Sequence, residues 1–452
     1  MTNNPSRREF IKLAAGTGLA GHKAATVLRA APPPQVSAND RIRLATIGIG
    51  GQGTYDTTTA LRVPGVELVA AADVYDGRLV RANEVFGASV QTTRDYREVL
   101  ARSDVDAVII ATPDHWHAQV SIDAMNAGKD VYCEKPMVQT IADGHRVIDA
   151  ERRTKRIFQV GSQRVSSVIY AKARDLMKAG AIGELNLVEA WWDRNSPVGA
   201  WQYTLPADAS PATVDWDRFL GQAPKRPFEP IRLFRWRNYR DYGTGVAGDL
   251  FVHLFSGMHF IVGALGPTRV MSTGGLRFWN DGRDVPDVML GLYDYPRTPA
   301  HPAFTLALKV NFVSGEGENS GLRFVGSEGI LTIGDEGVTL AKKGTRKAPE
   351  YTIGTFPLAA QEAFLREYQA KYPDAASEVE GGRRDTYAPP SDYSDSLDHF
   401  TNFFQAVRSR KAPVEDSTFG LRAAGPALVS NQSYFEGKPI AWNPDTMAIT
   451  TA

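Results

Sequence analysis

The sequence predicts an α/β fold in two parts: a doubly wound parallel sheet of the Rossmann type, then an α+β part with a mostly antiparallel open sheet and helices on one face. Three observations predict it. Between residues 41 and 160, short runs rich in Val, Ile and Ala alternate with helical patterns. A glycine-rich turn follows the first of these runs. Beyond residue 161, strand-like runs follow one another without regular helices between them, which favours antiparallel pairing.

The composition is that of an ordinary globular protein. Its 452 residues suit two or three domains, and 43% are hydrophobic and 23% charged. Basic and acidic residues number 51 each, so the overall charge favours neither a nucleic-acid partner nor an anionic membrane. Cys133 is the single cysteine of the chain, which excludes an intramolecular disulfide.

The N-terminal residues 1–31 have the features of an export signal. The run Ser6–Lys12 fits a twin-arginine pattern, a small-residue stretch follows, and the apolar region is too short to span a bilayer. His22 and Lys23 interrupt that region, so a cytoplasmic extension is the alternative. We expect export by the twin-arginine route to the periplasm, with no membrane insertion and with residues 32–40 as a proline-rich linker.

The first strand, turn and helix predict a dinucleotide site. Residues 42–47 indicate a strand and residues 54–61 a helix, and the glycine-rich turn lies between them. Its first glycine permits the tight turn, its second admits the pyrophosphate, and its third allows close packing of helix on strand. The predicted cofactor contacts of this turn are Gly48, Gly50, Gly51, Gln52 and Gly53.

An acidic residue closes the second strand. The run Val66–Ala72 indicates that strand, and Asp73 follows it, twenty positions beyond Gly53. A carboxylate there can accept hydrogen bonds from the ribose hydroxyls, which favours NAD over NADP. Arg78 keeps NADP possible, because its guanidinium could bind a 2′-phosphate.

The remaining runs of residues 41–160 complete the expected cofactor domain. Residues 106–111, 130–132 and 157–160 indicate further strands, and Thr140 to Asp143 resembles a capping-box start of a helix. Glu134 and Lys135 therefore belong on a loop at the carboxyl edge of the sheet, where open α/β sheets bind ligands.

Residues 161–395 are the expected substrate and oligomerisation domain. The polar segment 359–393 indicates a surface excursion, and 396–452 is expected to contain helices that pack back on the cofactor domain. The strand-like runs of this domain are 185–192, 269–273, 288–293, 303–312, 322–325 and 329–333.

Three further motifs, together with the turn, resemble the Gfo/Idh/MocA family, named for glucose-fructose oxidoreductase, inositol dehydrogenase and a rhizopine catabolism protein. They are Ala111–His117, which contains a T-P-x-x-x-H stretch, then Glu134-Lys135-Pro136, and the glycine-rich Asp241–His253 with its D-x-x-x-H pair. The resemblance runs from about Arg41 to the C-terminal region. It implies a nicotinamide-dependent enzyme that self-associates through the sheet of its second domain.

Oxidising a sugar hydroxyl requires a base for the proton and a positive group near the developing alkoxide. Lys135 and His253 can supply them, and Asp249, four positions before His253, can orient the imidazole or raise its proton affinity. The resemblance implies the same roles: Lys135 as the active-site lysine, Asp249 as a substrate binder or orienter, and His253 as the general acid/base. Arg164 could reach a sugar hydroxyl from the domain interface.

The family stretch also implies neighbours of the cofactor. Thr112, Pro113 and His117 are expected to border it, with Glu134 and Lys135 beside them. His115 and His117 lack the accompanying His/Cys cluster of a metal site, so we expect no metal.

These features predict an NAD(P)-dependent oxidoreductase that acts by hydride transfer on a hydroxyl of a small carbohydrate, a polyol or a glycoside. Two alternatives remain. The first is an NAD-dependent glycosidase or lyase that oxidises its substrate transiently and eliminates the aglycone. The Gly-Tyr-Pro-Thr-His run that is typical of the N-acetylgalactosaminidase branch is replaced here by Gly248–His253, which weighs against it. The second is a non-catalytic, cofactor-bound sensor. If the export signal functions, we expect the cofactor to stay bound and to be recycled on the enzyme.

Overall fold

The computed structural model describes residues 26–27, 41–342, 352–371 and 382–450. Most of the predicted signal and the whole proline-rich linker lie outside the described residues. The short strand β1 (Thr26–Val27) is described, and it pairs in parallel with β15 (Arg384–Ala388).

The first domain is a doubly wound sheet of six parallel strands in the order β4-β3-β2-β5-β6-β7. The chain reverses direction across the sheet between β2 and β5, and the carboxyl ends of these strands border the crevice in which such sheets bind ligands. The strands are β2 (Ile42–Ile47), β3 (Val66–Ala72), β4 (Gln91–Thr93), β5 (Ala107–Ile110), β6 (Asp130–Cys133) and β7 (Phe158–Val160).

Helices cover both faces of this sheet, which is why its central strands are mostly apolar and buried. All four residues of β5 and of β6 are buried. The helices are α2 (Gly51–Ala60), α3 (Asp76–Phe86), α4 (Tyr96–Leu100), α5 (Asp114–Asn126) and α6 (Ile141–Thr154). The predicted Rossmann sheet is confirmed.

The second domain is built on an eleven-stranded sheet in the order β1-β15-β14-β13-β12-β8-β11-β10-β9-β16-β17. Its pairs are antiparallel except β8 with β11 and β1 with β15, which confirms a mostly antiparallel sheet. The strands not yet given are β8 (Leu185–Asp193), β9 (Arg269–Gly275), β10 (Val288–Tyr295), β11 (Phe304–Asn311), β12 (Asn319–Gly326), β13 (Gly329–Gly334), β14 (Gly337–Lys342), β16 (Ile440–Asn443) and β17 (Ala448–Thr450).

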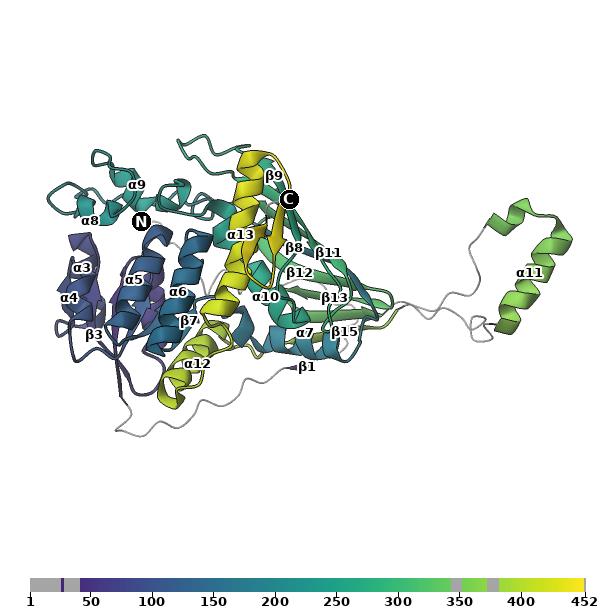
Figure 1. Ribbon diagram of the computed structural model, residues 1–452, viewed down its shortest axis with the longest axis horizontal. Helices are drawn as coiled ribbons and strands as arrows, with labels where there is room; N and C mark the ends of the chain where they lie inside the picture. The colour runs from purple at the N-terminus through teal and green to yellow at the C-terminus, as the bar shows by residue number, and fades with distance from the viewer. Residues whose placement is uncertain (1–25, 28–40, 343–351, 372–381, 451–452) are drawn as a thin grey trace, which may run out of the picture.

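Helices pack on one face of this sheet (Figure 1). They are α7 (Val168–Lys178), α10 (Val252–Val262) and α13 (Ser417–Glu436). Burial alternates along the strands accordingly: in β10, Met289 and Tyr293 are buried, whereas Leu290 and Leu292 are exposed on the opposite face.

The predicted surface excursion is partly correct. Helix α11 (Leu358–Lys371) has no buried residue and projects away from the sheet (Figure 1). The later strand β15, however, pairs with β14 and so belongs to the sheet. Its sequence, Arg-Asp-Thr-Tyr-Ala, has too little apolar alternation to indicate a strand, and the edge of β14 provides the pairing that forms it.

Two C-terminal helices connect the domains. Helix α12 (Asp395–Ser409) buries Phe400, Phe403 and Phe404 against the Rossmann sheet, where the Phe400 ring stacks on Tyr132 of β6 with centroids 4.3 Å apart. Helix α13 packs against α6 of the first domain and against β9 of the second. The relative position of the two sheets therefore depends on these helices.

Short helical segments complete the fold. They are η1 (Gln163–Ser166), α8 (Trp216–Leu220), α9 (Pro230–Phe234), η2 (Trp236–Asn238), the π-helical turn η3 (Ala247–Phe251) and η4 (Thr352–Thr355). Among the residues described, no helix combines the length and the apolar character needed to cross a bilayer.

Removing an aromatic ring from the interface between α12 and the Rossmann sheet should destabilise the protein. Phe403 is fully buried and its ring contacts Tyr132 edge-on. We expect Phe403→Ala to lower the free energy of unfolding by about 3–5 kcal/mol, because it leaves a cavity in a packed core. Phe356→Ala, at a side chain that is 51% exposed, is the control and should change it by less than about 0.5 kcal/mol. Chemical denaturation compares the two, and equal losses would contradict the assigned packing.

Candidate active site

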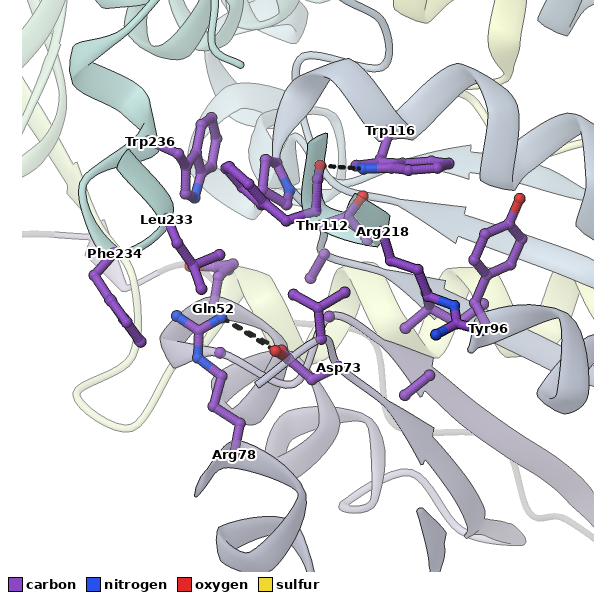
Figure 2. Close-up of a pocket in the computed structure, with 18 of the residues that line it drawn as sticks. Gln52, Asp73, Arg78, Tyr96, Thr112, Trp116, Arg218, Leu233, Phe234 and Trp236 are labelled. Carbon is purple, nitrogen blue, oxygen red and sulfur yellow. Dashed lines mark hydrogen bonds and ion pairs between the residues drawn. The ribbon is translucent and has the colours of Figure 1, made fainter. Parts of the chain in front are cut away.

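A cavity of about 520 Å³ lies between the carboxyl ends of the Rossmann strands and a segment of the second domain, residues 203–237 (Figure 2). Eight of the predicted cofactor residues line it: Gly48, Gly50, Gly51, Gln52, Asp73, Arg78, Thr112 and Pro113. We call this space the cofactor cavity.

The glycine-rich turn forms the floor of the cofactor cavity. Gly48 has a φ of +87°, a conformation that favours glycine. A Cβ on Gly53 would lie 2.0 Å from the carbonyl oxygen of Gly48, so the third glycine lies under the turn as a packing contact and does not line the cavity. Gly51 and Gln52 begin α2, where the first backbone N–H groups have no partner within the helix. Such a helix end suits a pyrophosphate.

Asp73 and Arg78 stand together at one end of this cavity (Figure 2). Asp73 is buried, accepts a hydrogen bond from the backbone N–H of Tyr75 at 3.1 Å, and has both carboxylate oxygens 3.4 Å from Nη1 of Arg78. The Arg78 guanidinium therefore already has an anionic partner. This pairing suits a cofactor with an unmodified ribose, because Asp73 would repel a 2′-phosphate.

Residues 203–237 form a cap over the cofactor cavity. The cap contributes apolar and aromatic side chains, among them Phe219, Leu233, Phe234 and Trp236. Its α8 and α9 lie beside the helices of the Rossmann domain (Figure 1). Aromatic residues are frequent in the sequence of this region, but nothing in their spacing indicates that they cover the first domain.

Direct hydrogen bonds hold the cap to the Rossmann domain. The backbone N–H of Asp215 donates to the Val74 carbonyl at 2.8 Å, and that of Asp76 donates to Thr213 at 3.0 Å. The Tyr75 hydroxyl donates to Asp208 at 2.6 Å. The cap is therefore an integral wall of the cavity.

A second cavity, of about 290 Å³, adjoins the first, and Gln52, Tyr203 and Arg237 line both. The structure brings the predicted residues Glu134, Lys135, Arg164, Asp249 and His253 together around this second cavity. We call it the substrate cavity.

The Asp249 carboxylate is held between two cations. Its Oδ1 accepts hydrogen bonds from Lys135 Nζ and from Arg237 Nε, each at 3.0 Å, and Lys135 also donates to the Asp249 carbonyl at 3.0 Å. Burial opposes ionisation of the Asp249 carboxyl, but Lys135 and Arg237 outweigh it and lower its pKa. Asp249 lies in the π-helical turn η3, directly before α10. It is therefore a carboxylate that positions Lys135.

His253 lies one turn further on, in α10, but it does not share the Asp249 carboxylate. Its Nδ1 lies 3.3 Å from the Ser162 hydroxyl, and its ring lies 5.1 Å, centroid to centroid, from Trp192. Burial lowers its pKa well below the ordinary value, and Lys135 and Arg164 lower it further. Among the hydrogen bonds of the described residues, none joins Asp249 to the imidazole: the Asp249 carboxylate accepts hydrogen bonds from Lys135 and Arg237, and the Ser162 hydroxyl contacts the ring. The Asp249 charge does raise the proton affinity of His253, as expected, but burial and the neighbouring cations outweigh it.

Glu134 and His117 differ from the cofactor contacts that were expected. Glu134 lines the substrate cavity, where burial raises its pKa to about 7 and Oε2 accepts a 3.3 Å hydrogen bond from the Lys135 backbone N–H. His117 lines neither cavity. It lies behind the wall, with Nε2 2.8 Å from the Thr112 carbonyl and Nδ1 2.7 Å from that of Pro136. It thereby joins the cofactor wall to the loop that carries Lys135.

Arg164 enters the substrate cavity from η1. Its Nη1 lies 3.6 Å from an Asp395 carboxylate oxygen, and its guanidinium lies 5.4 Å from the centre of the Trp192 ring. The sequence did not indicate two further cations of this cavity, Arg194 and Arg237, because neither belongs to a recognisable motif. Only the packing of the second domain places them here.

Two family models match the chain in order. A model of the Gfo/Idh/MocA oxidoreductase family, NAD-binding Rossmann fold, matches residues 42–162, and a model of the family's C-terminal alpha/beta domain matches residues 195–271. The first match contains the glycine-rich turn and Lys135, and the second contains the cap, Asp249 and His253.

Curated relatives are similar over part of the chain. An inositol 2-dehydrogenase of Salmonella typhimurium is 35% identical over 145 residues, which is 32% of this chain and 43% of the relative. A glycosyl hydrolase family 109 protein of Shewanella baltica is 31% identical over 210 residues, which is 40% of this chain and 45% of the relative. The chain thus spans less than half the length of these curated relatives.

A solved structure resembles the fold over most of its length. Levoglucosan dehydrogenase, in complex with NADH and levoglucosan, matches with a TM-score of 0.65 at 17% identity, covering 89% of this chain and 99% of that one. At this identity the likeness establishes the arrangement of the two domains.

Adding a methyl group under the glycine-rich turn should weaken NAD binding. Gly53→Ala forces the Gly48 carbonyl to move, because the new Cβ would lie 2.0 Å from its oxygen. We expect an affinity loss of roughly 5- to 150-fold, the range that corresponds to overpacking costs. Gly315→Ala is the matched control, since a Cβ there meets no atom within 4 Å. Calorimetric titration of NAD into cofactor-stripped protein compares the variants, and unchanged affinity in Gly53→Ala would show that the turn does not hold the pyrophosphate.

Proposed function

We propose that this chain, whose residues 42–162 and 195–271 match models of the Gfo/Idh/MocA oxidoreductase family, is an NAD-dependent enzyme that removes a hydride from a hydroxyl-bearing carbon of a sugar, polyol or glycoside. One observation carries the proposal: Lys135, Asp249 and His253 line a small cavity that shares Gln52, Tyr203 and Arg237 with the cofactor cavity. A substrate there would lie directly beside the cofactor.

The residues of the substrate cavity have separate roles in the proposed oxidation. Bound NAD supplies a hydride acceptor. Lys135, held by Asp249, is a positive group that stabilises negative charge developing on the substrate oxygen. His253 is a neutral base, because burial and the neighbouring cations disfavour its protonated form. Within the described residues, the imidazole is hydrogen-bonded to Ser162 through Nδ1; in the tautomer that carries its proton on Nδ1, Nε2 can accept the hydroxyl proton.

Removing either group should abolish most turnover while leaving NAD bound. We expect Lys135→Ala and His253→Ala each to lower kcat by roughly two to four orders of magnitude, the scale for losing a positioned charge or a general base. Lys438→Ala, at a lysine whose side chain is 64% exposed, is the control. Reduction of bound NAD by a panel of sugars and polyols measures turnover. Near-wild-type rates in both variants would place the chemistry elsewhere.

A second candidate is a glycosidase or lyase that oxidises its substrate only transiently. The similarity to the Shewanella baltica glycosyl hydrolase family 109 protein supports it. So does Glu134, whose pKa of about 7 leaves a protonated carboxyl available beside Lys135 as a donor to a leaving group. Such an enzyme would release the aglycone, incorporate deuterium from D₂O beside the oxidised carbon, and accumulate no NADH.

We further propose that the protein is exported by the twin-arginine route, which the Ser6–Lys12 pattern supports.

We also propose that the chain assembles with a second copy through the outer face of the second sheet. The outward side chains of β9 and β10 support the assembly, because Met271, Leu290 and Leu292 are each between 44% and 46% exposed.

The hydrogen-bonded cap supports a cofactor that stays bound through many turnovers. Dialysed protein should therefore retain stoichiometric nicotinamide cofactor and remain active without added NAD. The cofactor should return its hydride to an acceptor or to the eliminated product on the enzyme. The measurement is the nucleotide released on denaturation after exhaustive dialysis, followed by assay. Full loss of activity that free NAD restores would instead describe an exchangeable dehydrogenase and would count against export.

A further inference from the structure

The substrate cavity contains more cationic side chains than its carboxylates neutralise. Lys135, Arg164, Arg194 and Arg237 line it, together with two acidic residues, Asp249 and Glu134. Lys135 and Arg237 both pair with Asp249. Burial raises the Glu134 pKa to about 7, which reduces its negative charge. The positive charges of Arg164 and Arg194 therefore have no counter-charge left among the acidic side chains that line the cavity.

Arg194 has no anionic partner within ion-pair distance in the described ranges. It follows the last residue of β8, and its Nη1 donates to the Gly199 carbonyl at 2.7 Å. Its guanidinium lies 6.0 Å from the centre of the Trp192 ring and 5.5 Å from that of Phe312. The guanidinium has five N–H donors, so most of its hydrogen-bonding capacity is available to a ligand.

Arg164 reaches the same aromatic ring. Its only ion pair in the described structure, with Asp395, is long at 3.6 Å, and Asp395 is itself 32% exposed to solvent. Its guanidinium lies 5.4 Å from the centre of Trp192. Trp192 in turn lies 5.1 Å from His253, centroid to centroid. Both arginines therefore lie near the Trp192 ring, which itself lies beside the proposed base.

A neutral sugar would leave the Arg194 guanidinium without an anionic partner and Arg164 with its long contact to Asp395 alone. Desolvating an unpaired charge is costly, whereas a carboxylate or phosphate can accept paired N–H donors from an arginine fork. In a cavity of about 290 Å³ the anionic group must also lie close to the carbon that is oxidised.

Resting on the proposed function, we infer that the substrate is an anionic sugar whose carboxylate or phosphate belongs to the same sugar unit that is oxidised, and that Arg194 and Arg164 bind this group. Arg194 is then a specificity-determining residue. It selects the charged substrate, while Lys135 and His253 act on the hydroxyl.

The test is calorimetric titration of the full-length, NAD-loaded protein with matched probes: glucose, glucuronate and glucose 6-phosphate, and galactose with galacturonate. We expect at least one anionic probe to bind about tenfold or more tightly than its neutral counterpart. Glucuronate and glucose 6-phosphate separate a carboxylate site from a phosphate site.

Variants connect any preference to the arginines. Arg194→Gln and Arg164→Gln should each remove most of the preference, whereas Arg194→Lys should retain part of it because the charge remains. Arg146→Gln, at an arginine whose side chain is 58% exposed on α6, is the matched control and should keep the full preference. Circular dichroism verifies the fold of each variant.

Binding and redox chemistry are read separately, so the two proposals can fail independently. Equal affinity for anionic and neutral probes, or a preference that survives in both glutamine variants, overturns the anionic-substrate inference. Neutral sugars that reduce the bound NAD would leave the oxidoreductase function standing in that case. Arginine-dependent binding of an anionic probe without any hydride transfer would support the anion site and count against the oxidoreductase.

Discussion

The Asp249 carboxylate, shared by Lys135 and Arg237, is the interaction on which the site depends. Lys135 comes from the loop after β6, Arg237 from the cap, and Asp249 from the π-helical turn before α10. One carboxylate therefore joins three separate segments. A buried charge without its partners is strongly destabilising, so this contact requires the two domains and the cap to meet in one arrangement.

The same arrangement makes the cofactor cavity a space between domains. The Rossmann edge supplies the glycine-rich turn and Asp73, and the cap supplies the opposite wall. Since backbone hydrogen bonds connect this wall to Val74 and Asp76, a ligand would leave only if those bonds opened or through the mouth of the cavity. The proposed retention of the cofactor and the proposed position of the substrate thus have the same structural basis, which is the docking of the second domain on the first.

Burial gives the ionisable groups of the site different states. Asp249 remains ionised because two cations contact it, whereas Glu134 lies against its neighbour Lys135 with an elevated pKa, and His253 is neutral. A cation, a neutral base and a weakly acidic carboxyl are thereby available around one small cavity. This set is compatible with simple oxidation and also with oxidation followed by elimination, which is why the two candidate functions share the same residues.

By itself the sequence determined those features that depend on neighbouring residues or on short motifs. The strand, turn and helix from Ile42 to Ala60, and Asp73 after the next strand, follow from apolar periodicity and glycine positions. The motifs around Lys135 and His253 identified residues that do line one cavity. Only the tertiary structure decided which charges pair. Lys135 and Asp249 are 114 positions apart, and their contact depends on domain docking. That docking paired Asp249 with Lys135 and Arg237, placed His117 outside both cavities, and brought Arg194 and Arg164 to the lining of one cavity. No local pattern encodes these contacts, because they depend on distance in space.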